Sequence, residues 1–460
     1  MLLKGTMNKK RAGLAGAFLC LALAGIALLI ALTGPSRAAL PNDATHLGVA
    51  SCGGTTCHGR QYADGKVVRQ DEILRWQEPS ASGGAHSRAF GVLGNARGRQ
   101  IAARLGLGNP QAATECLGCH SDPGKRGGQF HLSDGVGCEA CHGGAQNWLA
   151  SHYAVGGTHS ANVARGMVPL DRPMAKAAVC LDCHFGSADG GQFVTHRMMA
   201  AGHPRISFEL DLFSTLQQHW NEDGDYAARK GRTNNVRVWA VGQAMAVDRA
   251  LGLFVGSLGQ DGAFPQFTFY DCHSCHRAIR DGASFSPTVL ANPGRPLPPG
   301  SPPFNDENMI MLSAAARIAA PELAQRFDAD SRAFHAAMAQ GRPQAIAAAA
   351  RLRTSAQTLA ATFNGTAFSR QQTFAMLDAI GSEAIAPRFT DYAGSTQAVM
   401  AMDTLLGGLV AQGSVSAANA AAVRGDINRA YAAVRDPNAY KPLEYRQALG
   451  SAIRGIRSLR

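Results

Sequence analysis

The sequence predicts a mainly α-helical protein with two dissimilar parts, on three observations. Residues 39–285 are rich in glycine, show few long periodic segments and hold ten of the eleven cysteines. Prolines gather in residues 286–303, where they break regular structure and favour extended backbone. Residues 304–460 contain no cysteine. They are dominated by alanine, with leucine or phenylalanine recurring at helical spacing. We therefore expect a first domain with little regular structure, a Pro-rich linker and a C-terminal α-helical bundle.

The cysteines of the first domain follow one pattern. Two cysteines stand three positions apart, with histidine next, at Cys116/Cys119/His120, Cys138/Cys141/His142, Cys180/Cys183/His184 and Cys272/Cys275/His276. This spacing is typical of c-type haem attachment, in which both thiols add to vinyl groups of the porphyrin and the histidine becomes an axial iron ligand. A shuffled chain of this composition would contain roughly 0.01 such motifs. Four copies are therefore not accidental.

A fifth copy of the motif is longer. Cys52 and Cys57 are separated by four residues, beginning with Gly53 and Gly54, before His58 follows. We expect the two glycines to supply the unusual dihedral angles that a bulged loop requires. With this copy, ten cysteines form five pairs and only Cys20 is left over. The sequence thus predicts five covalently attached haems c, around which the first domain folds as stacked haems wrapped by peptide.

Two other uses of paired cysteines fit less well. Five disulfides would also use ten cysteines, but nothing in a disulfide requires histidine after every second cysteine. Zinc sites built from such pairs need two pairs for each metal and, again, no adjacent histidine. Dinucleotide-binding glycine fingerprints and phosphate-binding glycine-lysine loops are not evident in the sequence, so the redox chemistry would depend on haem alone.

Helices are expected in both parts of the chain. In the first domain the periodicity favours helices over Arg88–Leu105 and Val236–Leu258, and the second is so apolar that we expect it to be buried against haem or the bundle. The expected N-caps of the bundle helices are Asp306, Ser369 and Ser416. Pro437 and Pro442 are expected to interrupt the last segment. We interpret the bundle as scaffold or docking surface.

Residues 1–38 have the features of an export signal. Basic residues precede an apolar run from Leu14 to Leu32, and Ser36-Arg37-Ala38 offers a small-x-small cleavage site. We expect a periplasmic protein with this segment removed; the alternative is an uncleaved anchor in the inner membrane, because the run is just long enough to span a bilayer.

The formal charge of +11 does not indicate a nucleic-acid partner. Five of the basic residues lie in residues 1–38, which leaves 39 basic against 33 acidic side chains in the remainder. Five haems would add about ten propionate charges against about five net positive ferric centres, so the loaded protein would be close to neutral. We expect redox partner proteins, either quinol-oxidising or haem-containing, and no nucleic acid.

Ten further histidines could bind the second axial position of the five irons. They are His46, His86, His131, His152, His159, His196, His203, His219, His273 and His335. His196 and His203 are seven residues apart, so on a helix they would share a face. His86 stands at an expected helix start, and His152 follows the motif at His142 by ten residues.

The predicted distal ligands are His86, His152, His196, His203 and His159. His159 and His219 have about equal support from their context, and His159 completes the predicted set. We interpret His46, His273 and His335 as bystanders. Bis-histidine ligation of all five irons suits electron transfer, whereas one open position would admit a small ligand.

Several of these segments resemble one family. Gly135–Gly144 followed by His152 resembles the third haem segment of the cytochrome c-554 multihaem family, and Trp76 followed by Ala85–Phe90 is similar to its distal-ligand segment. The motifs at Cys116 and Cys180 fit its second and fourth haem sites, and His196-x6-His203-Pro204 also resembles the wider family. The resemblance covers about residues 47–205.

The resemblance implies short helices around closely stacked haems and electron transfer in the periplasm, in some members from hydroxylamine oxidation. Some members keep one five-coordinate haem. This chain departs from the family by its longer first motif, by the motif at Cys272 and by the C-terminal bundle. Because of these departures, the resemblance does not assign the chain to any particular pathway, including nitrogen oxidation.

The sequence therefore favours a periplasmic pentahaem c-type cytochrome that transfers electrons between redox partners. The alternative is a multihaem oxidoreductase acting on a small nitrogen or sulfur compound at one haem with an open axial site. A third hypothesis is a polymerising conductive or structural subunit that assembles through the bundle. The surplus of histidines over irons favours the electron carrier over an enzyme.

Overall fold

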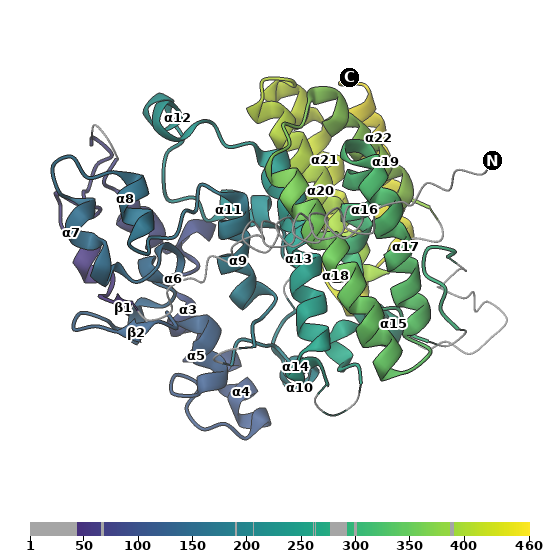
Figure 1. Cartoon of the computed structure of the whole chain (residues 1–460), viewed down its shortest axis with the longest axis horizontal. Coiled ribbons are helices and arrows are strands. Elements are labelled where there is room, and N and C mark those ends of the chain that lie inside the picture. The colour runs from purple at the N-terminus through teal and green to yellow at the C-terminus, as the bar shows by residue number, and fades with distance from the viewer. Residues whose placement is uncertain are drawn as a thin grey trace, which may run out of the picture. The chain divides into compact units, whose positions relative to one another are not determined.

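The computed structural model describes residues 44–65, 69–188, 191–205, 207–260, 262, 264–276, 292–298, 301–386 and 391–460 (Figure 1). The predicted export signal at 1–38, with Cys20, lies outside the described residues. Residues 286–291 and 299–300 of the predicted linker lie outside them as well.

The part of the chain that carries the cysteine motifs forms short helices joined by irregular loops. Their bounds are α2 (Glu72–Trp76), α3 (Ala89–Leu93), α4 (Ala96–Leu105), α5 (Thr114–His120), α6 (Cys138–His142), α7 (Leu149–His152), α8 (His159–Ala164), α9 (Pro173–His184), α10 (His196–Ala200), α11 (Leu210–Leu216), α12 (Gly224–Lys230), α14 (Ser257–Gln260) and α15 (Cys272–Cys275). Two short parallel strands, β1 (Thr45–His46) and β2 (Lys125–Arg126), pair with Thr45 opposite Lys125. The prediction of a mainly helical protein is confirmed.

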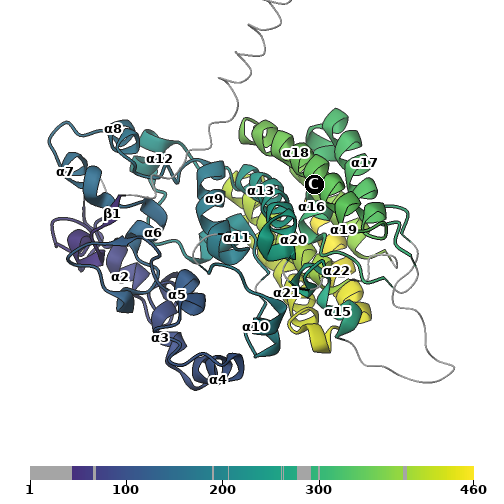
Figure 2. The same ribbon diagram turned by 60° about the horizontal axis from the view of Figure 1, so that its bottom comes forward.

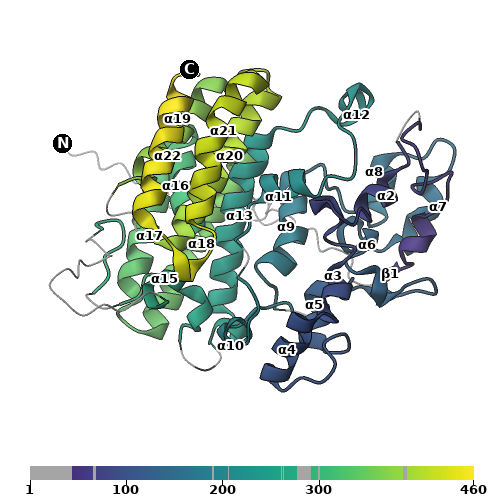
Figure 3. The same cartoon turned by 180° about the vertical axis from the view of Figure 1, so that it is seen from behind.

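Longer helices form the rest of the described structure. They are α13 (Asn235–Val255), α16 (Glu307–Ala319), α17 (Pro321–Ala337), α18 (Arg342–Asn364), α19 (Arg370–Ala384), α20 (Tyr392–Ala411), α21 (Ala417–Ala433) and α22 (Pro442–Arg457). Helices α16–α22 lie side by side as the expected bundle (Figures 1 and 3).

The helix boundaries expected from capping residues are confirmed. The hydroxyl of Ser369 accepts a hydrogen bond from the Gln372 backbone and completes a capping box, and Ser416 caps α21 through the Asn419 backbone. Pro442 begins α22, as a proline at the first turn should. Asp306 also precedes its helix, but its carboxylate pairs with Arg295 instead of capping the backbone.

Helix α13 is the link between the motif-bearing helices and the bundle. It packs against α16, α18 and α20 of the bundle and against α9 and α11 on its other side (Figure 2). Trp239 and Phe254 within it are fully buried, so the expected burial of this segment is confirmed. Length and composition alone would let α13 cross a membrane, but 67% of its apolar window is buried inside the structure.

The hydrophobic core continues across the predicted linker. One cluster of buried side chains extends from Phe193 through α13 to Ile456 at the end of the bundle. A smaller cluster joins α13 to α9, the helix with the fourth motif, through Val238 and Leu181. The motif-bearing helices are thus fastened to the bundle by shared apolar packing.

Candidate haem-binding sites

Four of the five motifs lie on helices. Cys116 to His120 closes α5, Cys138 begins α6, His184 ends α9, and α15 begins at Cys272 with His276 directly after it. Residues three and four positions apart share a helix face, so each helix presents two thiols and one imidazole together. Local helix formation therefore builds the attachment geometry directly from the sequence.

The first motif has a loop in place of a helix. The backbone N–H of His58 donates to the Cys52 carbonyl at 3.1 Å, which closes the loop. Our reason for the two glycines is wrong, because neither adopts positive φ and Gly53 lies at φ −81°, ψ −2°. The residue that must be glycine is Gly59, where a Cβ would approach the Gly53 carbonyl oxygen to 2.1 Å.

Each motif histidine faces one other histidine. The ring-centroid distances are 6.1 Å for His58–His152, 6.2 Å for His86–His184, 6.3 Å for His120–His203, 6.5 Å for His142–His219 and 6.2 Å for His196–His276. Segments far apart in the sequence supply the two members of most pairs. The five pairs use ten different histidines.

This spacing fits an iron between the two rings. An imidazole nitrogen binds a metal at about 2 Å and lies about 1 Å from its own ring centre, so two imidazoles on opposite faces of one metal have centroids about 6 Å apart. Direct ring stacking would bring the centroids closer, as for His184 and Phe208 at 4.4 Å. The residues present therefore fit a haem at each of the five places.

Four of the predicted distal histidines take part in these pairs: His86, His152, His196 and His203. His159 does not, because its Nε2 lies 3.2 Å from Asp171 Oδ1 and its side chain is 41% exposed. His219 faces His142 in its place. On this geometry, His219 replaces His159 in the set of candidate ligands.

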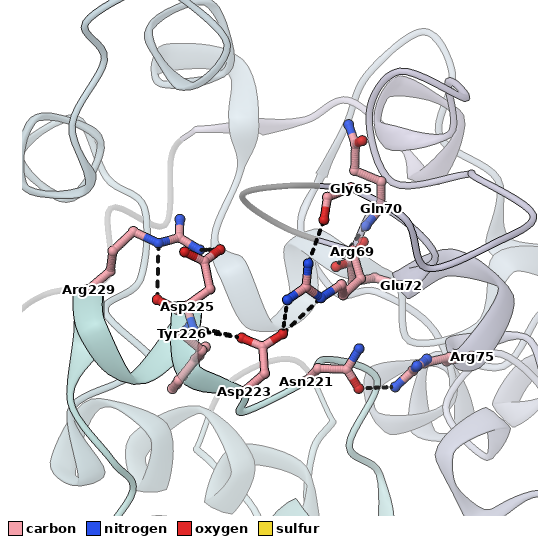
Figure 4. Close-up of polar contacts among 10 residues, drawn as sticks. All are labelled: Gly65, Arg69, Gln70, Glu72, Arg75, Asn221, Asp223, Asp225, Tyr226 and Arg229. Atoms are coloured by element: carbon pink, nitrogen blue, oxygen red, sulfur yellow. Dashed lines mark hydrogen bonds and ion pairs between the residues drawn. The ribbon is translucent and has the colours of Figure 1, made fainter.

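Ion pairs and hydrogen bonds hold the segment that carries His219 (Figure 4). Asp223, four residues after His219, pairs with Arg69, and Asn221 accepts a hydrogen bond from Arg75 at 2.8 Å. Asp223 also caps α12 through the backbone of Tyr226. The chain after the first motif therefore fixes the loop that supplies a histidine opposite the third motif.

Hydrogen bonds at Nδ1 orient several of these rings. His58 Nδ1 lies 3.0 Å from Glu72 Oε2, while His120 and His203 each place Nδ1 2.8 Å from a backbone carbonyl oxygen. His219 Nδ1 lies 3.2 Å from the Gln217 carbonyl oxygen. A carbonyl partner at Nδ1 selects the tautomer whose Nε2 carries a lone pair, which is the form that binds a metal.

Burial keeps most of the paired rings neutral. Desolvation lowers the pKa of His142 to about 3 and that of His184 to about 4. The pKa values of His86, His152 and His219 are also lowered, chiefly by burial. Neutral imidazole is the ligating form. His58 differs, because its hydrogen bond to Glu72 raises its pKa.

Glu72 is a residue that sequence reasoning missed, and it gives a first prediction. A carboxylate at Nδ1 makes an imidazole a stronger electron donor and so stabilises ferric over ferrous iron. We expect Glu72→Gln to raise the reduction potential of the haem at His58 by on the order of tens of millivolts. A spectroelectrochemical titration measures this, and an unchanged set of five potentials would refute the role.

The motifs contact one another in pairs. The Cys138 thiol lowers the pKa of the Cys52 thiol, so the first and third motifs lie next to each other. Cys119 and Cys183 interact in the same way, and Gln192 donates to both Gly118 and Cys183 between them. Among the described residues all ten motif cysteines are free thiols, so the disulfide alternative gains no support.

The three histidines interpreted as bystanders have other partners. His46 Nδ1 lies 2.7 Å from Asp122 Oδ1, and His335, fully buried in α17, lies 3.3 Å from Asp306 Oδ2. His273, inside the fifth motif, points to the bundle: its Nδ1 lies 3.1 Å from the Pro437 carbonyl oxygen and its ring meets that of Tyr440 edge-on.

Part of the chain matches a known protein family. Residues 51–143 match the model of the family described as cytochrome c554 and c-prime. The matched segment contains the first three motifs. Searches among curated proteins and solved structures found no match to the chain. The family match supports a c-type cytochrome, which binds haem covalently and transfers electrons.

Proposed function

We propose that this chain is an exported cytochrome with five haems c that carries electrons between redox partner proteins, each iron being held by two histidines. The observation that supports this most directly is that every motif histidine faces one other histidine at 6.1–6.5 Å. Haem supplies one-electron chemistry when bound. Two neutral imidazoles keep iron low-spin, with little change of geometry on reduction.

Contacts among the motifs support transfer along one series. Motif 1 touches motif 3 through Cys52 and Cys138, and motif 2 touches motif 4 through Cys119 and Cys183. Helices α6 and α9 join motifs 3 and 4. The segment from His196 to His203 faces motif 5 at one end and motif 2 at the other. The motifs thus form the order 1, 3, 4, 2, 5.

The same pairs weigh against catalysis at an open iron. An oxidoreductase acting on a nitrogen or sulfur compound needs one axial position free for its substrate. His142 faces His219, whereas His159 pairs with Asp171, so the third motif also has a second histidine for its iron. Export to the periplasm, and quinol-oxidising or haem proteins as partners, rest on the sequence of residues 1–38 and on the electron-transfer role.

The mass of the purified holoprotein tests the haem number. We expect five haems on a chain that lacks residues 1–38, and no carbon monoxide adduct of the reduced protein, because every iron has two protein ligands. A mass with four haems would refute the proposed number. Stoichiometric carbon monoxide binding to one reduced haem would favour the oxidoreductase.

A further inference from the structure

A group of buried charged side chains lies beside the fifth motif. Its members are Arg205, Asp271, Arg295, Asp306, Glu307 and Asp391. They come from the loop after α10, the residue before α15, the segment before α16, the start of α16 and the N-cap of α20. Glu307 and Asp271 are 4% and 3% exposed.

Arg205 joins this group to the haem attachment point. Its Nη1 lies 3.4 Å from Cys272 Sγ and 3.3 Å from the Tyr270 carbonyl oxygen. Its Nη2 lies 3.9 Å from Glu307 Oε1. Arg205 would thus contact a thioether at Cys272 with one nitrogen and Glu307 with the other.

The bundle holds the fifth motif in this position. Asp271 Oδ1 accepts a hydrogen bond from the backbone of Ala393 at the start of α20, and His273 contacts Pro437. Phe269 and Phe304 stack next to Phe254 in the core. The bundle therefore forms one wall of the fifth haem site.

Three of the four carboxylates have firm partners. Arg295 pairs with Asp306 at 2.6 Å and with Asp391 at 2.7 Å. Asp271 accepts hydrogen bonds from two backbone N–H groups, of Ser274 and Ala393, each at 3.1 Å. The contact with Arg295 lowers the pKa of Asp306, whereas burial raises the pKa of Asp271 to about 6 despite its two hydrogen bonds.

Glu307 is the exception. Its Oε1 accepts a hydrogen bond from Asn305 at 3.1 Å, but Arg205 approaches Oε1 only to 3.9 Å and Oε2 is buried without a hydrogen-bond partner. Four carboxylates face two guanidinium groups, which leaves two negative charges in excess. Asp271 has two backbone N–H donors, so Glu307 is the least compensated carboxylate, and an unpaired buried charge is costly.

The pKa of Glu307 follows from these contacts. Burial raises the pKa of Glu307 to about 7, against the attraction of Arg205 and with the repulsion of Asp391 and Asp271. His335 meets the group only through Asp306, and Tyr392 of α20 also faces Glu307. Glu307 is therefore poised to change its charge near neutral pH.

We propose that Glu307 binds a proton when the haem attached at Cys272 and Cys275 is reduced, which couples proton uptake to electron transfer at this haem. The electron comes from the neighbouring redox centre or donor protein, and the proton comes from solvent. Added negative charge at the iron favours the neutral carboxylic acid at Glu307. On reoxidation the carboxylate re-forms and the proton returns to solvent.

The coupling has a defined sign. At low pH Glu307 is protonated in both redox states, and at high pH it is ionised in both. The reduction potential of the fifth haem is therefore independent of pH in both limits, and its value is lower in the high-pH limit. Between the two pKa values, each pH unit lowers the reduced-to-oxidised ratio by up to about tenfold, which is about 59 mV for one electron. Glu307→Gln should hold the potential at the upper level throughout.

The test is a set of spectroelectrochemical titrations of the holoprotein from pH 5.5 to 8.5. It compares wild type, Glu307→Gln and, as a matched control in the same bundle, Asp328→Asn, whose carboxylate contacts Ser313 and Arg317 away from the motifs. His196→Ala identifies the relevant component, because it removes the ring facing His276. Proton uptake on reduction, measured with a pH dye on wild type, requires no variant.

Around pH 7 we expect the potential of the fifth haem to depend on pH in wild type and Asp328→Asn but not in Glu307→Gln, and we expect uptake of up to one proton per protein when this haem is reduced. A flat potential in wild type, or the same slope in Glu307→Gln, would overturn the inference. The inference rests on the proposed five-haem function, and haem mass on the same samples separates the two: five haems with a flat potential would refute only the coupling.

Discussion

Replacing His219 with alanine is expected to convert one of the five low-spin haems to a high-spin form that binds carbon monoxide when reduced. The reason is that His219 is the ring facing His142 at 6.5 Å, in a place where burial lowers the pKa of both. No other described histidine is paired with His142. Optical and carbon monoxide difference spectra measure the change as about one fifth of the haem.

His159→Ala is the matched control for this variant. It removes a histidine of similar sequence context whose ring pairs with Asp171 at the surface. We expect a spectrum identical to that of the wild type and a loss of stability under about 1 kcal/mol, as is usual for an exposed ion pair. High-spin haem in His159→Ala, with none in His219→Ala, would reverse the assignment.

Replacing Cys138 and Cys141 together is expected to remove one haem and to weaken its neighbours. Cys138 contacts Cys52 of the first motif, and α6 packs against α9 of the fourth, so the third site lies within the series. Because haem supplies the buried surface around which this region folds, its loss should expose adjacent segments to proteolysis. Mass spectrometry gives the haem number, and limited proteolysis reports the loosening.

The comparison variant replaces Cys272 and Cys275. The fifth motif lies at one end of the series, and the apolar bundle packs beneath it. We expect four haems and a resistant core. Five haems in the Cys138/Cys141 variant would refute attachment there, and equal proteolysis of the two variants would contradict the order of sites.

The haem-attachment motifs and the helix caps could be predicted from the sequence, because both depend on residues close together in the chain. Helix geometry alone brings two thiols and an imidazole together at Cys180, Cys183 and His184. The capping residues Ser369 and Ser416 also act through backbone groups within three positions. Such features need no knowledge of distant segments.

The pairing of rings depends on contacts between distant segments, which is why the sequence alone does not separate His159 from His219. His219 lies 77 residues after His142 and is brought there by the ion pair of Arg69 and Asp223, themselves 154 residues apart. Neither arginine nor aspartate stands in a motif. A single sequence holds no signal for such a contact, apart from the surplus of histidines.

Two other features could not be predicted from the sequence, because they also depend on the folded chain. The need for glycine in the first motif lies at Gly59, because the loop folds back on the Gly53 carbonyl, which is a property of the closed loop. The burial of α13 was evident from its composition, but its contacts with α9 on one side and α18 on the other follow from tertiary packing.

Electron paramagnetic resonance of the oxidised protein, on a sample whose mass gives five haems, tests the central claim most directly. Bis-histidine ligation of every iron predicts low-spin ferric signals only. Their integrated intensity should correspond to about five S = 1/2 centres per protein, once magnetic interactions between neighbouring haems are included. One stoichiometric high-spin signal would contradict the account, and it would direct attention to hydroxylamine, nitrite, nitric oxide and sulfur oxyanions as ligands of an open iron.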